Sequence, residues 1–157
     1  MSINNLNIYN KLIKLTRNKI LYLNLNKKET FSDRLVILFF HFGFFLKYYK
    51  NHISKRDSQA LFDFFIRQIE LSIREIGYGD VSVNKKMKQY VNLFYSIIEK
   101  IEIWENQDNA SRGIILDKFL NIGKDNQFYV DYFEKYRIYI TKNTLNTFTK
   151  DILNVKF

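Results

Sequence analysis

The amino-acid sequence predicts an all-α protein, a single helical domain of about six to seven helices over residues 1–157. Three observations favour this class: apolar residues recur three and four positions apart, proline is absent, and no segment alternates convincingly as a strand. A length of 157 residues suits one domain, and 46% hydrophobic residues are enough for a core.

Two helices are expected over the first 50 residues of the chain. Residues 5–25 carry a loose apolar stripe, and Thr30 and Asp33 then have the spacing of a capping box before a helix over 33–50. That helix is apolar on nearly every face, which is typical of a helix that is central in the fold or covers a partner. Its most apolar run, residues 35–46, would rise about 18 Å, short of the roughly 30 Å of a bilayer core. We therefore expect a buried or partner-binding helix and no membrane span.

The later helices follow from caps and glycines. Ser54 offers an N-cap to a helix with a clean apolar stripe, which a glycine pair beginning at Gly77 should end. Asp80 or Ser82 is expected to cap the next helix, over about 83–104. Shorter helices are expected near residues 112–121, 126–141 and 144–154.

The sequence holds few residues for catalysis. The absence of cysteine excludes disulfides, thiolate zinc sites and thiol nucleophiles, and His41 and His52 are too few for paired-histidine metal motifs. No phosphate-binding loop, dinucleotide fingerprint or nucleophile elbow is present. We expect a protein that is not an enzyme, with no cofactor, metal or small-molecule substrate. An unrecognised enzyme would need Arg34, His41 and Glu75 to form a polar pocket through converging helices.

A basic cluster follows the glycine pair, in a chain of net charge +9. Lys85, Lys86 and Lys88 are expected in the first two turns of a helix, where the helix dipole disfavours cations and Asp80 offsets part of the cost. An anion would make this cluster favourable, and the candidates are phosphate, RNA, lipid headgroups or an acidic protein segment. Tyr78 is the best candidate for stacking on bases. The alternatives are chance placement in a lysine-rich chain and ordinary aromatic packing.

Arg34 and His41 are seven residues apart and so share one helix face. Either residue can anchor a buried polar network or meet a partner. For His41, between two phenylalanines, we favour the structural role.

Several motifs together resemble the ubiquinol–cytochrome c chaperone family. They are SQALFD at residues 58–63, IREIGYGDVSV at 73–83 and KKMK at 85–88. The spacing of Arg34 and His41 also matches an arginine and a histidine of that family. The resemblance is best over residues 30–105. Three departures are Tyr78 for a small aliphatic residue, Ser96-Ile97 for Gly-Arg, and Leu120-Asn121 for Arg-Asn.

The resemblance implies a bacterial-type assembly factor that binds newly made cytochrome b and promotes assembly of ubiquinol–cytochrome c reductase, respiratory complex III. Mitochondrial members also work with a small partner protein and the ribosome. The start of the chain has no signal-peptide pattern. We expect a cytoplasmic protein peripheral to the inner membrane, in contact with an anionic membrane surface (mitochondrial matrix for a eukaryotic chain). The expected client- or partner-binding residues are Arg74, Glu75, Tyr78, Gly79, Asp80, Lys85, Lys86 and Lys88.

Two alternatives stay open at this point. Glu75 and Asp80 can hold the glycine loop instead of binding a partner. The whole chain can also be a basic nucleic-acid- or ribosome-binding module that uses the same lysines, in which case its affinity for RNA or DNA should fall steeply with salt.

Overall fold

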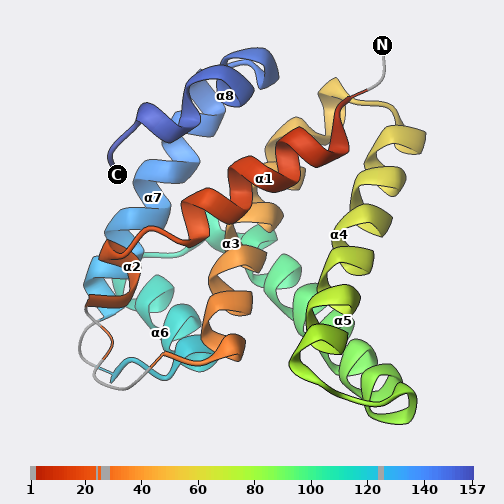
Figure 1. Ribbon diagram of the computed structural model, residues 1–157. Helices are drawn as coiled ribbons and strands as arrows, with labels where there is room; N and C mark the ends of the chain where they lie inside the picture. The colour runs from red at the N-terminus through yellow and green to blue at the C-terminus, as the bar shows by residue number, and fades with distance from the viewer. Residues whose placement is uncertain (1–2, 24, 26–28, 124–125) are drawn as a thin grey trace.

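The computed structural model describes residues 3–23, 25, 29–123 and 126–157. This part of the chain forms eight α-helices and no strand, which confirms the all-α class with one helix more than expected (Figure 1). Short 3-10 turns join or end the helices. The elements are α1 (Asn5–Thr16), α2 (Ile20–Leu23), α3 (Phe31–Tyr49), η1 (Lys50–His52), α4 (Lys55–Ile76), α5 (Asp80–Ile103), η2 (Trp104–Asn106), α6 (Asn109–Leu120), α7 (Asn126–Lys142), α8 (Leu145–Asp151) and η4 (Ile152–Asn154).

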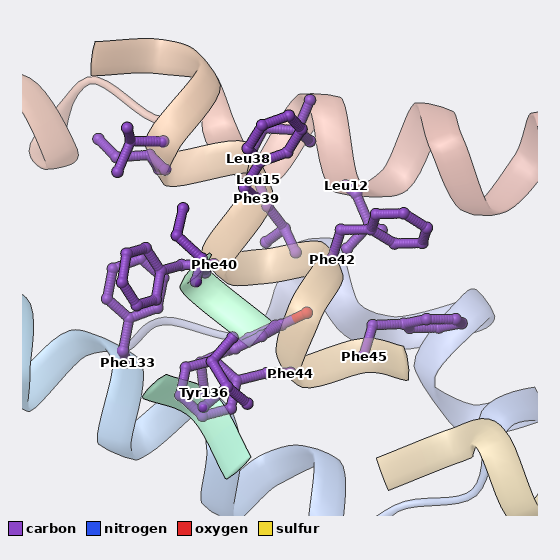
Figure 2. Close-up of a cluster of buried hydrophobic side chains, with 14 of the residues drawn as sticks. Leu12, Leu15, Leu38, Phe39, Phe40, Phe42, Phe44, Phe45, Phe133 and Tyr136 are labelled. Carbon is purple, nitrogen blue, oxygen red and sulfur yellow. The ribbon is translucent and has the colours of Figure 1, made fainter. Parts of the chain in front are cut away.

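Helix α3 is the centre of the fold. The predicted capping box begins it: Asp33 N–H donates to Thr30 Oγ1 at 3.1 Å, and Thr30 N–H donates to the Asp33 carboxylate at 3.0 Å. The helix contacts α1, α5, α6 and α7. Its phenylalanines meet leucines of α1 and aromatic residues of α7 (Figure 2). The all-round apolar character of α3 therefore reflects a central position, because its phenylalanines are buried and it is the end of the helix, at Leu46 and Lys47, that borders a groove.

Several buried tyrosines connect the helices through hydrogen bonds from their hydroxyl groups. The hydroxyl of Tyr136 in α7 donates to the carbonyl of His41 at 2.9 Å, and that of Tyr49 in α3 donates to the carbonyl of Asn143 at 3.0 Å. A buried tyrosine thus contributes apolar area and still satisfies its one polar atom. These bonds attach α7 to the central helix at two levels.

The structure corrects the ends of two predicted helices. The single helix expected over residues 5–25 is two, because α1 ends at Thr16; residue 24 lies outside the described residues. Between them the Asn18 side chain accepts from the Ile20 N–H at 3.2 Å, the kind of local bond that competes with a continuous helix. The helix expected from residue 83 begins three residues earlier. Gly79 is its N-cap and provides no side-chain bond, so neither Asp80 nor Ser82 is the cap.

Gly43 allows α3 and α5 to approach closely, and we expect Gly43→Ala to lower the free energy of unfolding by about 1 kcal/mol. A β-carbon at residue 43 would lie 2.4 Å from Cδ1 of the buried Ile101. Overpacking costs about 2 kcal/mol, and the higher helix propensity of alanine returns about 1 kcal/mol. Urea unfolding followed by circular dichroism measures the difference.

A double-mutant cycle tests the origin of this loss. Ile101→Val removes the methyl group that meets the new β-carbon. It should therefore lower the free energy of unfolding by less in the Gly43→Ala variant than in the natural chain. Equal costs in the two backgrounds would contradict the close contact.

Candidate functional site

Helices α4 and α5 form a hairpin whose tip (residues 76–81) lies at the lower right of Figure 1, far from both chain ends. Gly77 ends α4 with a φ of 110°, a left-handed conformation that residues with a β-carbon seldom adopt. Its N–H donates to the carbonyl of Arg74 at 3.0 Å. The prediction that this glycine ends the helix is confirmed, and the chain turns directly into α5.

Arg74 holds the two sides of the tip together. It donates from Nη1 to the Asp80 carboxylate at the start of α5, and its Nη2 lies 3.5 Å from Glu70 one turn back in α4. The hydrogen bond to Asp80 is the main cause that raises the pKa of the Arg74 guanidinium above its usual value. Of the two acidic residues considered for holding the loop, Asp80 therefore makes this contact, while Glu75 is exposed at the end of α4.

Three apolar side chains are exposed around the tip. Ile76 is 57% exposed, Tyr78 is 41% exposed and Val81 is 86% exposed. No heavy atom lies within 4 Å of the positions that β-carbons would take at Gly77 and Gly79, so the loop between them is open to solvent. The end of the hairpin thus presents apolar groups to water.

The three lysines lie deeper in α5 than expected. Because the helix begins at Asp80, Lys85 and Lys86 are its sixth and seventh residues and Lys88 is its ninth. The dipole acts mainly within the first turn. Its predicted unfavourable interaction with the lysines is therefore weak at Lys85 and Lys86, and the prediction is wrong for Lys88. The Nζ of Lys86 lies 5.1 Å from the centre of the Tyr78 ring, a cation–π distance that brings loop and lysine together.

A groove of about 600 Å³ opens further along the hairpin, between α4, α5 and the end of α3. Phe62 of α4 and Tyr95 of α5 stack at 6.1 Å between ring centres on its apolar side. Lys50 and Lys55 contribute cationic groups to its rim. This groove offers a client exposed aromatic surface, which the buried face of α3 does not.

His41 belongs to the core. It is fully buried, its Nδ1 lies 2.9 Å from the carbonyl of Ile37, and its Nε2 lies 2.7 Å from the hydroxyl of Tyr132. Burial lowers the pKa of His41 to about 3, against the smaller opposite effect of the bond to the Ile37 carbonyl. The imidazole is therefore neutral at pH 7, with Nδ1–H donating to Ile37 and Nε2 accepting from Tyr132.

The three residues of the possible enzyme site do not come together. Arg34 is exposed near the start of α3, where it lies 3.8 Å from Glu29, whereas His41 is enclosed by aromatic rings. Glu75 is exposed at the far end of α4. The seven-residue spacing thus puts Arg34 at the surface and His41 in the core. Within the described ranges, no three His, Cys, Asp or Glu side chains gather in a way that would hold a metal ion.

A second polar cluster, around Glu134, is one that the sequence did not reveal. Its carboxylate accepts from Trp104 Nε1 at 2.8 Å and from Arg137 Nε at 3.1 Å, and lies 3.2 Å from Arg112 Nη1. Only the Glu134–Arg137 spacing of three residues is visible in the sequence. The cluster joins η2, α6 and α7 and stabilises the fold at the end of α5 opposite the hairpin tip.

Comparison with known protein families gives a match. The family model described as ubiquinol-cytochrome C chaperone matches residues 23–110, more than half of the 157 residues. The matched range holds the whole of α3, α4 and α5, and so includes the hairpin tip and the groove. No curated protein and no protein of solved structure matches the chain.

Proposed function

Because the chain belongs to the ubiquinol-cytochrome C chaperone family, we propose that it binds newly made cytochrome b and promotes its assembly into respiratory complex III. The family's role is that of a chaperone in the assembly of this complex. The match over residues 23–110 is the observation that carries the proposal, because it spans the central helix and the complete hairpin.

The proposed activity is binding, without catalysis. The one buried histidine is neutral and enclosed by tyrosine and phenylalanine rings, and the polar residues nearest the tip form an ion pair. These groups maintain the structure and leave the exposed apolar and basic side chains of the hairpin to meet other molecules. A chaperone needs such a surface because its client is recognised and released unchanged.

We place the client- and partner-binding surface on the hairpin. Arg74, Asp80 and the glycines shape it, while Tyr78 and the lysines are exposed or half-buried there and can contact a partner. The groove behind the tip adds an aromatic surface for an apolar client segment. The proposed contact residues are Arg74, Glu75, Tyr78, Gly79, Asp80, Lys85, Lys86 and Lys88.

Deletion of the gene tests the proposed function directly. We expect the deletion strain to lose most of its cytochrome b and its complex III activity, because an unprotected client is degraded. Expression of the natural chain should restore both quantities. Normal cytochrome b content and normal complex III activity in the deletion strain would show the proposal to be wrong.

Reversing the three hairpin lysines tests the binding surface. We expect Lys85→Glu with Lys86→Glu and Lys88→Glu to lower recovery of cytochrome b about tenfold, since several exposed charge contacts of up to about 1 kcal/mol each become repulsive. The measurement is a pull-down from detergent-solubilised native membranes, probed for cytochrome b.

The matched control reverses three exposed lysines elsewhere, Lys135, Lys150 and Lys156. It changes the net charge equally, and we expect it to leave the recovery of cytochrome b unchanged. Equal losses from both triple variants would mean that total charge, and not the hairpin, governs binding.

A basic nucleic-acid- or ribosome-binding module is the second candidate, favoured by the exposed Tyr78 beside Lys86. It predicts RNA affinity that falls steeply with salt and disappears in the triple hairpin variant. The same pull-down, probed for ribosomal proteins and for a small partner protein, tests those two partners.

We propose a cytoplasmic location peripheral to the inner membrane, or the mitochondrial matrix for a eukaryotic chain. No helix in the described part of the chain is long and apolar enough to cross a bilayer.

A further inference from the structure

We propose that the hairpin tip docks on an anionic lipid bilayer, with Ile76, Tyr78 and Val81 entering the headgroup region and the lysines of α5 contacting the lipid phosphates. The inference rests on the proposed function in one respect, because it names a partner for the same hairpin. Its physical basis is the arrangement of apolar and basic side chains along α5.

The apolar groups lie at the outermost part of the hairpin. Val81, in the first turn of α5, is 86% exposed, and Ile76 at the end of α4 is 57% exposed. Tyr78 lies between them in the loop and is 41% exposed. An aromatic ring with a polar hydroxyl and two aliphatic side chains suit the boundary between water and acyl chains.

The lysines follow behind these apolar groups at the depth of the headgroups. Val81, Lys85 and Lys88 are at positions i, i+4 and i+7 and so share one face of α5. With a rise of 1.5 Å per residue, Lys85 lies about 6 Å and Lys88 about 10 Å along the helix from Val81. Interfacial apolar groups are buried about 5–10 Å deep, so an inserted Val81 brings both ammonium groups to the phosphate level.

The charge of α5 complements an anionic surface. Between Asp80 and Glu99 the helix carries three lysines and no acidic residue. Asp80 itself is engaged by Arg74, which reduces its repulsion of lipid phosphates. Lys86, whose ammonium group lies over the Tyr78 ring, joins the apolar and the basic parts of the surface.

The shape of the tip favours a bilayer over a folded protein or RNA. No heavy atom lies within 4 Å of the positions that β-carbons would take at Gly77 and Gly79, so the loop at the tip projects into solvent. A projection with an apolar end fits a soft planar surface. RNA would engage the lysines and stack on Tyr78, but it would leave Ile76 and Val81 without a role.

Flotation of the purified full chain with lipid vesicles tests the inference. We expect binding to phosphatidylcholine vesicles that contain about one third phosphatidylglycerol, and at least about tenfold weaker binding to phosphatidylcholine alone. Ile76→Ser with Val81→Ser should weaken binding to the anionic vesicles about tenfold, and so should the triple reversal of Lys85, Lys86 and Lys88.

Two matched controls separate the tip from general properties of the chain. Ile114→Ser with Leu153→Ser removes exposed apolar groups on α6 and η4, and the triple reversal of Lys135, Lys150 and Lys156 changes the net charge equally. Both controls should bind anionic vesicles like the natural chain. Circular dichroism should show that every variant retains its helix content.

Three results would overturn the inference: no binding of the natural chain to anionic vesicles, full binding by the Ile76→Ser, Val81→Ser variant, or binding to single-stranded RNA but not to vesicles. The vesicles contain no cytochrome b, and the client pull-down uses detergent-solubilised membranes, in which no bilayer remains. If the chain does not bind vesicles but captures cytochrome b normally, this inference alone is contradicted. If it binds vesicles but does not capture cytochrome b, only the proposed client is contradicted.

Discussion

Replacing Glu134 by alanine is expected to lower the free energy of unfolding by about 3 kcal/mol. The carboxylate accepts from Trp104 and binds Arg137, and its Oε2 lies 3.2 Å from Nη1 of Arg112. Burial alone would raise the pKa of Glu134, but the hydrogen bonds from Arg137 and Trp104 hold it below its usual value. Without Glu134, two mostly buried guanidinium groups and an indole N–H lose their shared acceptor.

Urea unfolding at pH 7, followed by circular dichroism, measures this loss. Glu102→Ala is the control, because Glu102 is half-exposed and its carboxylate lies 4.0 Å from Lys50, so we expect a loss below about 0.5 kcal/mol. Replacing Glu134, Arg112 and Arg137 together with apolar residues of similar size should restore most of the stability, since no buried charge is then left unpaired. A Glu134→Ala variant as stable as Glu102→Ala would contradict this account.

The sequence could not reveal the Glu134 cluster because its members are distant along the chain. Trp104 and Glu134 are 30 residues apart, and Arg137 also reaches Glu105 of η2 at 3.3 Å. Nothing in local spacing indicates that η2 packs against α7. The Glu134 carboxylate thus joins η2, α6 and α7, although the sequence shows only its spacing to Arg137.

Local signals, by contrast, predicted the N-caps of two helices correctly. The Thr30–Asp33 capping box is present, and Ser54 caps α4 by accepting from the Asp57 N–H at 3.0 Å. Each depends on residues three apart and needs no information about packing. The start of α5 was placed three residues late because Gly79 caps it through backbone conformation alone, which leaves no polar side chain in the sequence to indicate it.

The candidate site was likewise predictable only in the features that depend on residues close together in the sequence. Tyr78, Lys86 and Asp80 lie close in sequence, so their grouping at the hairpin was predictable from the glycine pair. The exposure of Ile76 and Val81 was not, since an apolar residue in a helix pattern is usually expected to pack. Which apolar residues remain uncovered depends on where α4 and α5 extend beyond the other helices, and that is a property of the tertiary structure.

Lowering the pH from 7 to 5 is expected to cost the folded chain about 2 kcal/mol through His41 alone. The residue is fully buried, and burial lowers its pKa to about 3, whereas an unfolded histidine has a pKa of about 6.5. Between these values the unfolded chain binds one more proton than the folded chain, so stability falls as the pH falls. At about 1.4 kcal/mol per pH unit below 6.5, the loss at pH 5 is about 2 kcal/mol.

Urea unfolding at several pH values from 7.5 to about 5 gives this slope. Glu105, Asp108 and Glu134 have pKa values held below those of ordinary carboxylic acids, so they lose their stabilising charge only at lower pH. His41→Gln should be less stable at pH 7, because the bonds to Ile37 and Tyr132 are disturbed, yet its stability should change little down to pH 5. A natural chain equally stable at pH 7 and pH 5 would mean that the imidazole becomes protonated inside the core, where Tyr132 and the Ile37 carbonyl are its closest hydrogen-bond partners.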